Sequence, residues 1–208
     1  MYAFVDTYVR MQLEDVGGML RLPMRAHGLM NGCNFASASV MCNLLSGISV
    51  TTFRPVWAGR PEGRGTHRIG SGESFRELVK AFYPEPSAER REVIADMLYR
   101  HLPNPFAHTL GVRSKGGLRL NVIKRTTPRN VTTAGDGLTQ TEVAAIEESL
   151  QRPEGIGLGV QGGGRQWDIT VDFLYRDILD MMVALAEDAP QMQEAEARFQ
   201  HGTYVWRF

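Results

Sequence analysis

Apolar residues recur along most of the chain with the spacing of amphipathic helices. Near the N-terminus the apolar positions are three or four residues apart, which predicts a helix over about 3–22 with one apolar face, formed by Val5, Val9, Leu13, Val16 and Leu20. The same kind of spacing predicts further helices at 74–82, 87–102, 139–150 and 171–185, and a polar helix that starts at Pro190.

One segment is apolar on nearly every face. No Asp, Glu, Lys or Arg occurs from Ala26 to Phe53, and the part from Cys33 to Ser46 reads as a helix without a charged side. Such a helix is usually central and covered on several sides. The uncharged stretch is long enough to span a bilayer, but its asparagines, serines, threonines and glycines make insertion costly. We therefore expect the central helix of a soluble core and no membrane partner.

Strand patterns occupy a smaller part of the chain. Leu118, Leu120 and Val122 alternate with polar residues, and the ranges 157–161 and 166–170 flank the turn 162–164, which is three glycines. The sequence predicts a mainly α, bundle-like domain over 1–188. It carries a small antiparallel sheet of two or three strands inserted near 117–170, and a C-terminal tail follows at 189–208.

Charge is balanced overall and uneven locally. Among 208 residues, Lys plus Arg and Asp plus Glu each number 23, which excludes a globally basic nucleic-acid binder. Between Met97 and Gly135, however, there are seven bases and no acid: Arg100, Arg113, Lys115, Arg119, Lys124, Arg125 and Arg129. Such a segment attracts phosphates even at zero net charge, unless the acid-rich helices of 136–196 neutralise it within the same molecule.

The cysteine content and the N-terminal sequence indicate the cellular compartment of the protein. Cys33 and Cys42 are the two cysteines, with no CxxC pair and no zinc-ligand spacing, so we expect no disulfide framework, metal or cofactor. The N-terminal residues lack a basic region followed by an unbroken apolar core. These features predict a cytoplasmic protein.

The most specific string follows the helix at 87–102. Asn104 and His108 lie four residues apart, just beyond a proline break and inside the acid-free segment. A neutral His beside polar and cationic groups is a suitable general base, because it titrates near neutrality. Metal-free RNA cleavage needs such a base for the 2′-hydroxyl and a cation for the phosphorane. The alternative is a histidine that bonds to backbone at the end of the helix.

The run from Asn104 to His108, at the end of an amphipathic helix, resembles the active-site segment of the HEPN superfamily. That family comprises helical, usually dimeric domains, and many of them are metal-independent ribonucleases. Its motif is an Arg, commonly followed by a polar residue, and then a His. His108 and Asn104 match the His and the polar residue, but Pro103 stands at the position of the Arg.

Arg100 lies further upstream than the family's Arg, with seven residues between it and His108. The resemblance implies a homodimer that binds RNA or nucleotides, as a degenerate ribonuclease. Its catalytic residues would be His108, Asn104 and Arg100. The acid-free segment would supply the nucleic-acid-binding residues Arg113, Lys115 and Arg119.

Two other classes of function remain open. The chain would be a non-catalytic helical interaction module if the alternating aromatics Tyr204, Trp206 and Phe208 serve a dimer or partner surface. It would be a thiol hydrolase if Cys33, at the start of the central helix, is the nucleophile, because helix N-termini lower the pKa of thiols. His108 or His27 would then be the base and Asn104 its orienting residue.

Overall fold

A computed structural model describes residues 4–21, 34–53, 71–101, 119–123 and 157–200 of the chain. The chain begins with a π-helical segment, η1 (Phe4–Val9), that continues into α1 (Arg10–Arg21). The other described helices are α2 (Asn34–Thr52), α3 (Ser71–Phe82), α4 (Ala88–His101), α7 (Val171–Glu187) and α8 (Ala189–Gln200). The predicted mainly helical fold is confirmed, and the helix predicted at 139–150 lies outside the described residues.

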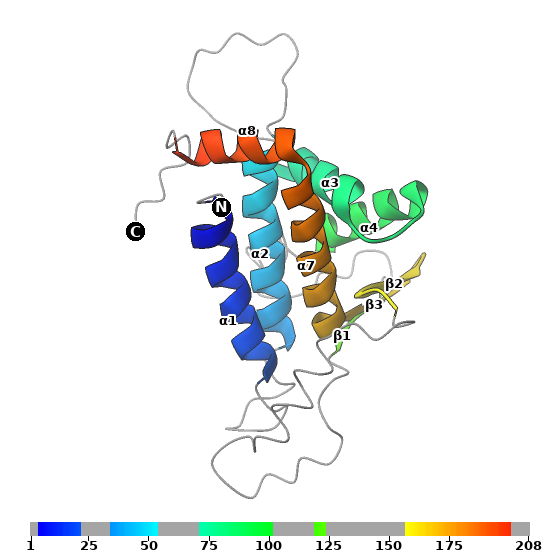
Figure 1. Cartoon of the computed structure of the whole chain (residues 1–208). Coiled ribbons are helices and arrows are strands. Elements are labelled where there is room, and N and C mark those ends of the chain that lie inside the picture. The colour runs from blue at the N-terminus through cyan, green and yellow to red at the C-terminus, as the bar shows by residue number, and fades with distance from the viewer. Residues whose placement is uncertain (1–3, 22–33, 54–70, 102–118, 124–156, 201–208) are drawn as a thin grey trace, which may run out of the picture.

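Helix α2 is the centre of the bundle. It packs against α1, α3, α7 and α8, and Figure 1 shows α1, α2 and α7 side by side with α8 across one end. Eleven of its residues are buried, which explains why a helix without a polar face is stable here. By length and composition α2 would also suffice to cross a bilayer, but in this fold other helices surround it.

The central helix runs six residues beyond its predicted end at Ser46. Its last turns contain β-branched residues, which are weak helix formers. Their hydroxyls are satisfied locally, because Thr51 and Thr52 donate to the carbonyls of Gly47 and Ile48 at 2.9 and 2.8 Å. Burial of Ile48 and of both threonines therefore outweighs the unfavourable propensity.

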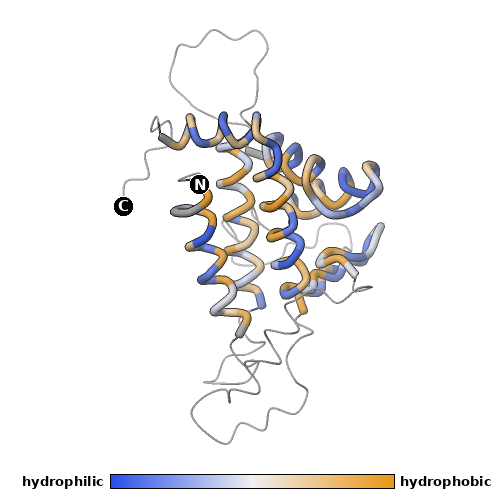
Figure 2. The backbone as a smooth tube through the Cα atoms, viewed as in Figure 1, coloured by the Kyte–Doolittle hydropathy of each residue, from blue (hydrophilic) through white to orange (hydrophobic). Residues whose placement is uncertain are grey.

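The predicted apolar faces form one core. Val9, Leu13, Val16 and Leu20 of the first stripe are buried, and Val5 is half-buried at its start. Figure 2 shows apolar positions along each of the packed helices. Helix α8 belongs to this core through Met192 and Ala195, both fully buried.

The sheet has three strands, β1 (Arg119–Ile123), β2 (Val160–Gly163) and β3 (Gln166–Thr170), in the order β1-β3-β2. The hairpin β2–β3 is antiparallel, but β1 lies parallel to β3, so the prediction of a purely antiparallel sheet is wrong. A two-residue turn forces β2 and β3 to be antiparallel. The long connection from β1 leaves room for the crossover that a parallel pair requires.

The starts of α3 and α4 differ in how closely they follow the predicted ranges. Ser87 caps α4, because its Oγ accepts a hydrogen bond from the backbone N–H of Arg90 at 3.2 Å. Helix α3 begins at Ser71, three residues before its predicted start, so Ser74 lies buried within its first turns.

Candidate anion-binding edge of the sheet

The two faces of the sheet have different chemistry because side chains alternate along each strand. Val160, Trp167 and Ile169 are buried on the inner face, as is Val122. The outward positions near the turn are polar and form two cross-strand rows, whereas the last row pairs the half-buried Ile123 with the buried Thr170; the polar positions are Arg119, Asn121, Gln161, Gln166 and Asp168.

Two arginines from distant parts of the chain come together through their backbones at one edge of the sheet. Arg119 starts β1, and its backbone N–H donates to the carbonyl of Arg165 in the β2–β3 turn at 2.7 Å. Both side chains are exposed. Among the described residues, no carboxylate lies within ion-pair distance of either guanidinium. The edge therefore carries two positive charges that the described part of the fold does not neutralise.

The turn that presents Arg165 depends on glycine. Gly162 and Gly164 have φ angles of 122° and 58°, values that other residues rarely adopt. At Gly162 a side chain would also collide with the backbone of β3. The triglycine run therefore holds Arg165 next to β1.

The next cross-strand row holds an amide and a carboxylate. Asn121 donates from Nδ2 to Oδ1 of Asp168 at 2.7 Å, across the parallel pair β1–β3. This bond ties the carboxylate to β1, one row away from the arginines. The outer face therefore offers cations at its edge, and amide groups from Gln161, Gln166 and Asn121 behind them.

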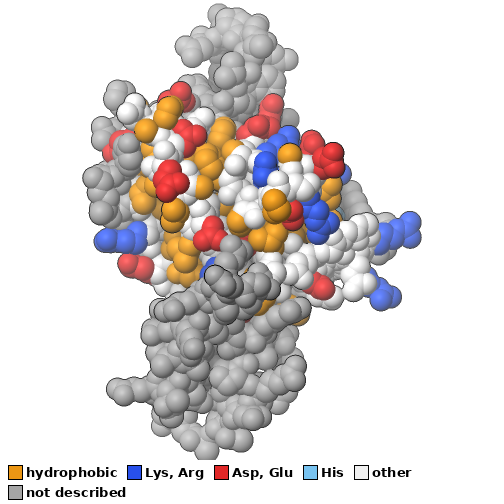
Figure 3. All heavy atoms as spheres, turned by 45° about the vertical axis from the view of Figure 1, so that its right-hand side comes forward, with side chains coloured by type: hydrophobic (Ala, Val, Ile, Leu, Met, Phe, Trp, Pro, Cys, Tyr) orange, Lys and Arg blue, Asp and Glu red, His pale blue; other side chains and the backbone are white. Residues whose placement is uncertain are grey.

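A third arginine lies near the turn, from the side of helix α4. The guanidinium carbon of Arg90 is 5.8 Å from the ring centre of Trp167, and Arg90 approaches the position of Gly163. Arg90 also pairs with Glu85 at 3.8 Å. Its charge is therefore partly compensated, unlike those of Arg119 and Arg165. Figure 3 shows basic side chains that project on the right, where the sheet lies in the view of Figure 1.

Of the predicted site residues, the structure describes Arg119 and Arg100. Arg100 lies in the last turn of α4 and pairs with Asp96 at 2.7 Å, while Arg76 from α3 binds the other oxygen of the same carboxylate. Its side chain remains 63% exposed. The other predicted residues lie outside the described part of the chain: His108, Asn104, Arg113, Lys115, Cys33 and His27.

Arg165 is the residue that the sequence analysis missed. The sequence does contain a signal for Arg165, because it is the basic residue directly after a triglycine turn between two predicted strands. Its backbone contact with Arg119 could not be predicted, because nothing local in the sequence specifies that β1 pairs with β3.

The described thiol has no sign of reactivity. Cys42 is fully buried in α2, and burial raises its pKa to about 12, so it stays protonated near neutral pH. Within the described ranges, no three His, Cys, Asp or Glu side chains are grouped so that they could hold a metal ion.

The chain was compared with protein-family models, with curated proteins and with solved structures, and none of them matches it.

Proposed function

We propose that this protein binds RNA or nucleotides through their phosphate groups, and that Arg119 and Arg165 at the sheet edge hold those phosphates. The observation that carries this proposal is that two exposed arginines, joined by a backbone hydrogen bond, have no carboxylate partner among the described residues. Guanidinium groups bind phosphate oxygens in a bidentate manner, and phosphate contacts dominate the affinity of nucleic-acid binders.

The sequence around Arg119 supports a polyanion in particular. Arg113, Lys115, Lys124 and Arg125 lie within six residues of Arg119, in a segment without acids. The amide side chains of Asn121 and Gln166 provide donors and acceptors behind the charged edge. A phosphodiester chain uses both kinds of group, since phosphates fix its register and base edges accept hydrogen bonds.

A ribonuclease activity is the further part of this proposal, and it depends on the HEPN-like run from Asn104 to His108. In that mechanism His108 accepts the proton of the 2′-hydroxyl, Asn104 orients the ribose, and Arg100 stabilises charge on the phosphorane. Incubation of RNA with the pure protein in chelator tests this step. Equal degradation by wild type and His108→Ala would show that the activity comes from elsewhere.

Binding is tested by fluorescence anisotropy of a labelled single-stranded RNA at low salt. The double variant Arg119→Gln/Arg165→Gln is expected to raise Kd about tenfold or more, equivalent to at least about 1.4 kcal/mol. The matched control is Arg10→Gln/Lys80→Gln. It removes the same charge from two residues that pair with Glu14 and Glu77 on other faces. Equal loss in the two double variants would contradict the sheet edge as the site.

A further inference from the structure

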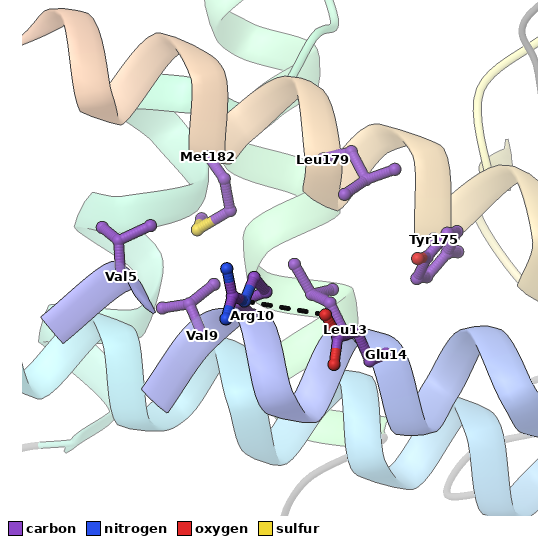
Figure 4. A pocket seen from close by; sticks show the side chains of 8 residues that line it. All are labelled: Val5, Val9, Arg10, Leu13, Glu14, Tyr175, Leu179 and Met182. Atoms are coloured by element: carbon purple, nitrogen blue, oxygen red, sulfur yellow. Dashed lines mark ion pairs between the residues drawn. The ribbon is translucent and has the colours of Figure 1, made fainter. Parts of the chain in front are cut away.

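A groove runs between the start of the chain and helix α7, away from the sheet edge. Figure 4 shows side chains from η1 and α1 on one side and from α7 on the other. The groove has a volume of about 410 Å³, within the range typical of ligand pockets. Its lining is mainly apolar: Val5, Val9, Leu13, Tyr175, Leu179 and Met182, with Arg10 and Glu14 at the rim.

The α7 side of the groove continues into an exposed apolar ridge. Leu179 is 36% exposed, and Val183, one turn further along the helix, is 60% exposed. Tyr175, Leu179 and Met182 are separated by four and three residues, which is the spacing of a helix face that packs against something. Tyr175 and Met182 are partly buried against the core, whereas no described helix or strand covers Leu179 and Val183.

One segment of the chain begins close to η1, which forms part of one side of this groove. Helix α8 ends at Gln200, and the ring centre of Phe199 lies 5.7 Å from that of Phe4. The backbone N–H of Phe4 also donates to Oε2 of Glu196 at 3.0 Å. These two contacts fix the last turn of α8 beside η1, at the residue that precedes Val5 of the groove lining.

We propose that residues 201–208 of the same chain dock in this groove in an extended conformation. Tyr204, Trp206 and Phe208 alternate with Val205 and Arg207. An extended backbone therefore turns the three rings to one side, toward the apolar lining. Arg207 is directed to the opposite side, away from the apolar lining.

The length of the segment suits the groove. Eight extended residues span about 26 Å at about 3.3 Å per residue. The distance along the helix axis from Val5 to Glu14 is about 14 Å, given nine residues at about 1.5 Å each. The segment therefore reaches the whole groove and retains enough chain for the turn away from α8.

Fluorine NMR of the full chain labelled with 5-fluorotryptophan tests the docking. The chain has three tryptophans, so the signals are assigned with Trp206→Phe and Trp57→Phe, and the buried Trp167 is an internal reference. We expect a solvent isotope shift for Trp206 that is close to that of Trp167 and well below that of the free peptide HGTYVWRF. In Leu179→Asp the Trp206 signal is expected to move to the position of the free peptide, with its full isotope shift restored.

The matched control is Met11→Asp, because Met11 is an exposed apolar residue of α1 outside the groove. This variant is expected to leave the Trp206 signal in place. Retention of the Trp167 signal shows that each variant is folded, and Leu179→Ser provides a milder change if Leu179→Asp does not fold. A full isotope shift for Trp206 in the unmodified chain overturns the proposal. A Trp206 signal that Leu179 variants do not move overturns it too, as does protection that is lost on dilution, which would place the segment on a second copy.

Discussion

The hydroxyl of Tyr83 lies 2.6 Å from Oδ2 of Asp177, and both residues are buried. The same carboxylate oxygen accepts the backbone N–H of Gly159 at 2.7 Å, and the Tyr83 oxygen accepts the N–H of Val160 at 3.3 Å. This small network joins the end of α3, the start of β2 and the second turn of α7. It therefore anchors the β2–β3 hairpin, which carries Arg165, to the helical core.

Tyr83→Phe is expected to lower the free energy of unfolding by about 2 kcal/mol, because it leaves a buried carboxyl oxygen and a buried N–H with one partner fewer. The measurement is urea denaturation followed by circular dichroism. Tyr99→Phe is the control, since Tyr99 is half-buried against Phe75 and its hydroxyl makes no hydrogen bond among the described residues. A similar loss in both variants would show that the network is not what stabilises the junction.

Replacement of glycine by alanine is expected to change the stability of the fold in opposite directions at two positions, Gly159 and Gly18. A Cβ at Gly159 would lie 2.2 Å from the backbone nitrogen of Leu174, which cannot move without displacing α7. Gly159→Ala should therefore destabilise the fold by about 1–3 kcal/mol. Gly18, within α1, has nothing within 4 Å of such a Cβ, and Gly18→Ala should stabilise by about 0.5–1 kcal/mol.

Thermal unfolding of the two alanine variants and the wild type checks this pair of predictions. The midpoint should fall for Gly159→Ala and rise for Gly18→Ala. A rise for both would mean that β2 can move away from α7 at little cost, so that the hairpin is not held rigidly against the helix.

The helical part of the fold could be predicted because its signal is local. Stripes such as Val9, Leu13 and Val16 specify both a helix and its buried face, and the structure buries them as expected. The direction of β1 could not be predicted, because the alternation of apolar and polar residues is the same whichever way a strand runs. Leu120 and Val122 show the same pattern in a parallel and in an antiparallel pair.

The candidate site was predicted only in part, for the same physical reason. Arg119 was found through its neighbours in an acid-free segment, which is a property of the sequence alone. Arg165 joins it through a long-range backbone hydrogen bond, and Asp96 compensates Arg100 within one helix turn. Which cations have carboxylate partners depends on these contacts, and composition over a segment does not determine it.

The thiol of Cys42 is expected to be inert in the folded protein. Burial raises its pKa from 9.0 to about 12, so near neutral pH its thiolate fraction is about a thousandfold lower than that of an unperturbed thiol. In the Cys33→Ser background, iodoacetamide at pH 8 should label Cys42 only after urea is added. Rapid labelling without urea would show that α2 opens readily.

The same shift predicts how stability depends on pH. Between about 9 and about 12 the folded protein keeps the Cys42 proton and the unfolded chain releases it, so stability falls as pH rises through this window. Below pH 9 both states are protonated and this residue contributes no slope. The unfolding free energy of Cys33→Ser should therefore decline more steeply above pH 9 than that of Cys33→Ser/Cys42→Ala.

Salt dependence distinguishes phosphate contacts at the sheet edge from indirect effects of the same substitutions. For single-stranded nucleic acid, each neutralised phosphate adds about 0.7 to the slope of log K against log salt concentration. Arg119→Gln/Arg165→Gln should thus reduce the magnitude of that slope by about 1.4 if each guanidinium contacts one phosphate. Arg10→Gln/Lys80→Gln should leave it unchanged. Weaker binding with an unaltered slope would mean that the two arginines support the shape of the sheet and do not touch phosphate.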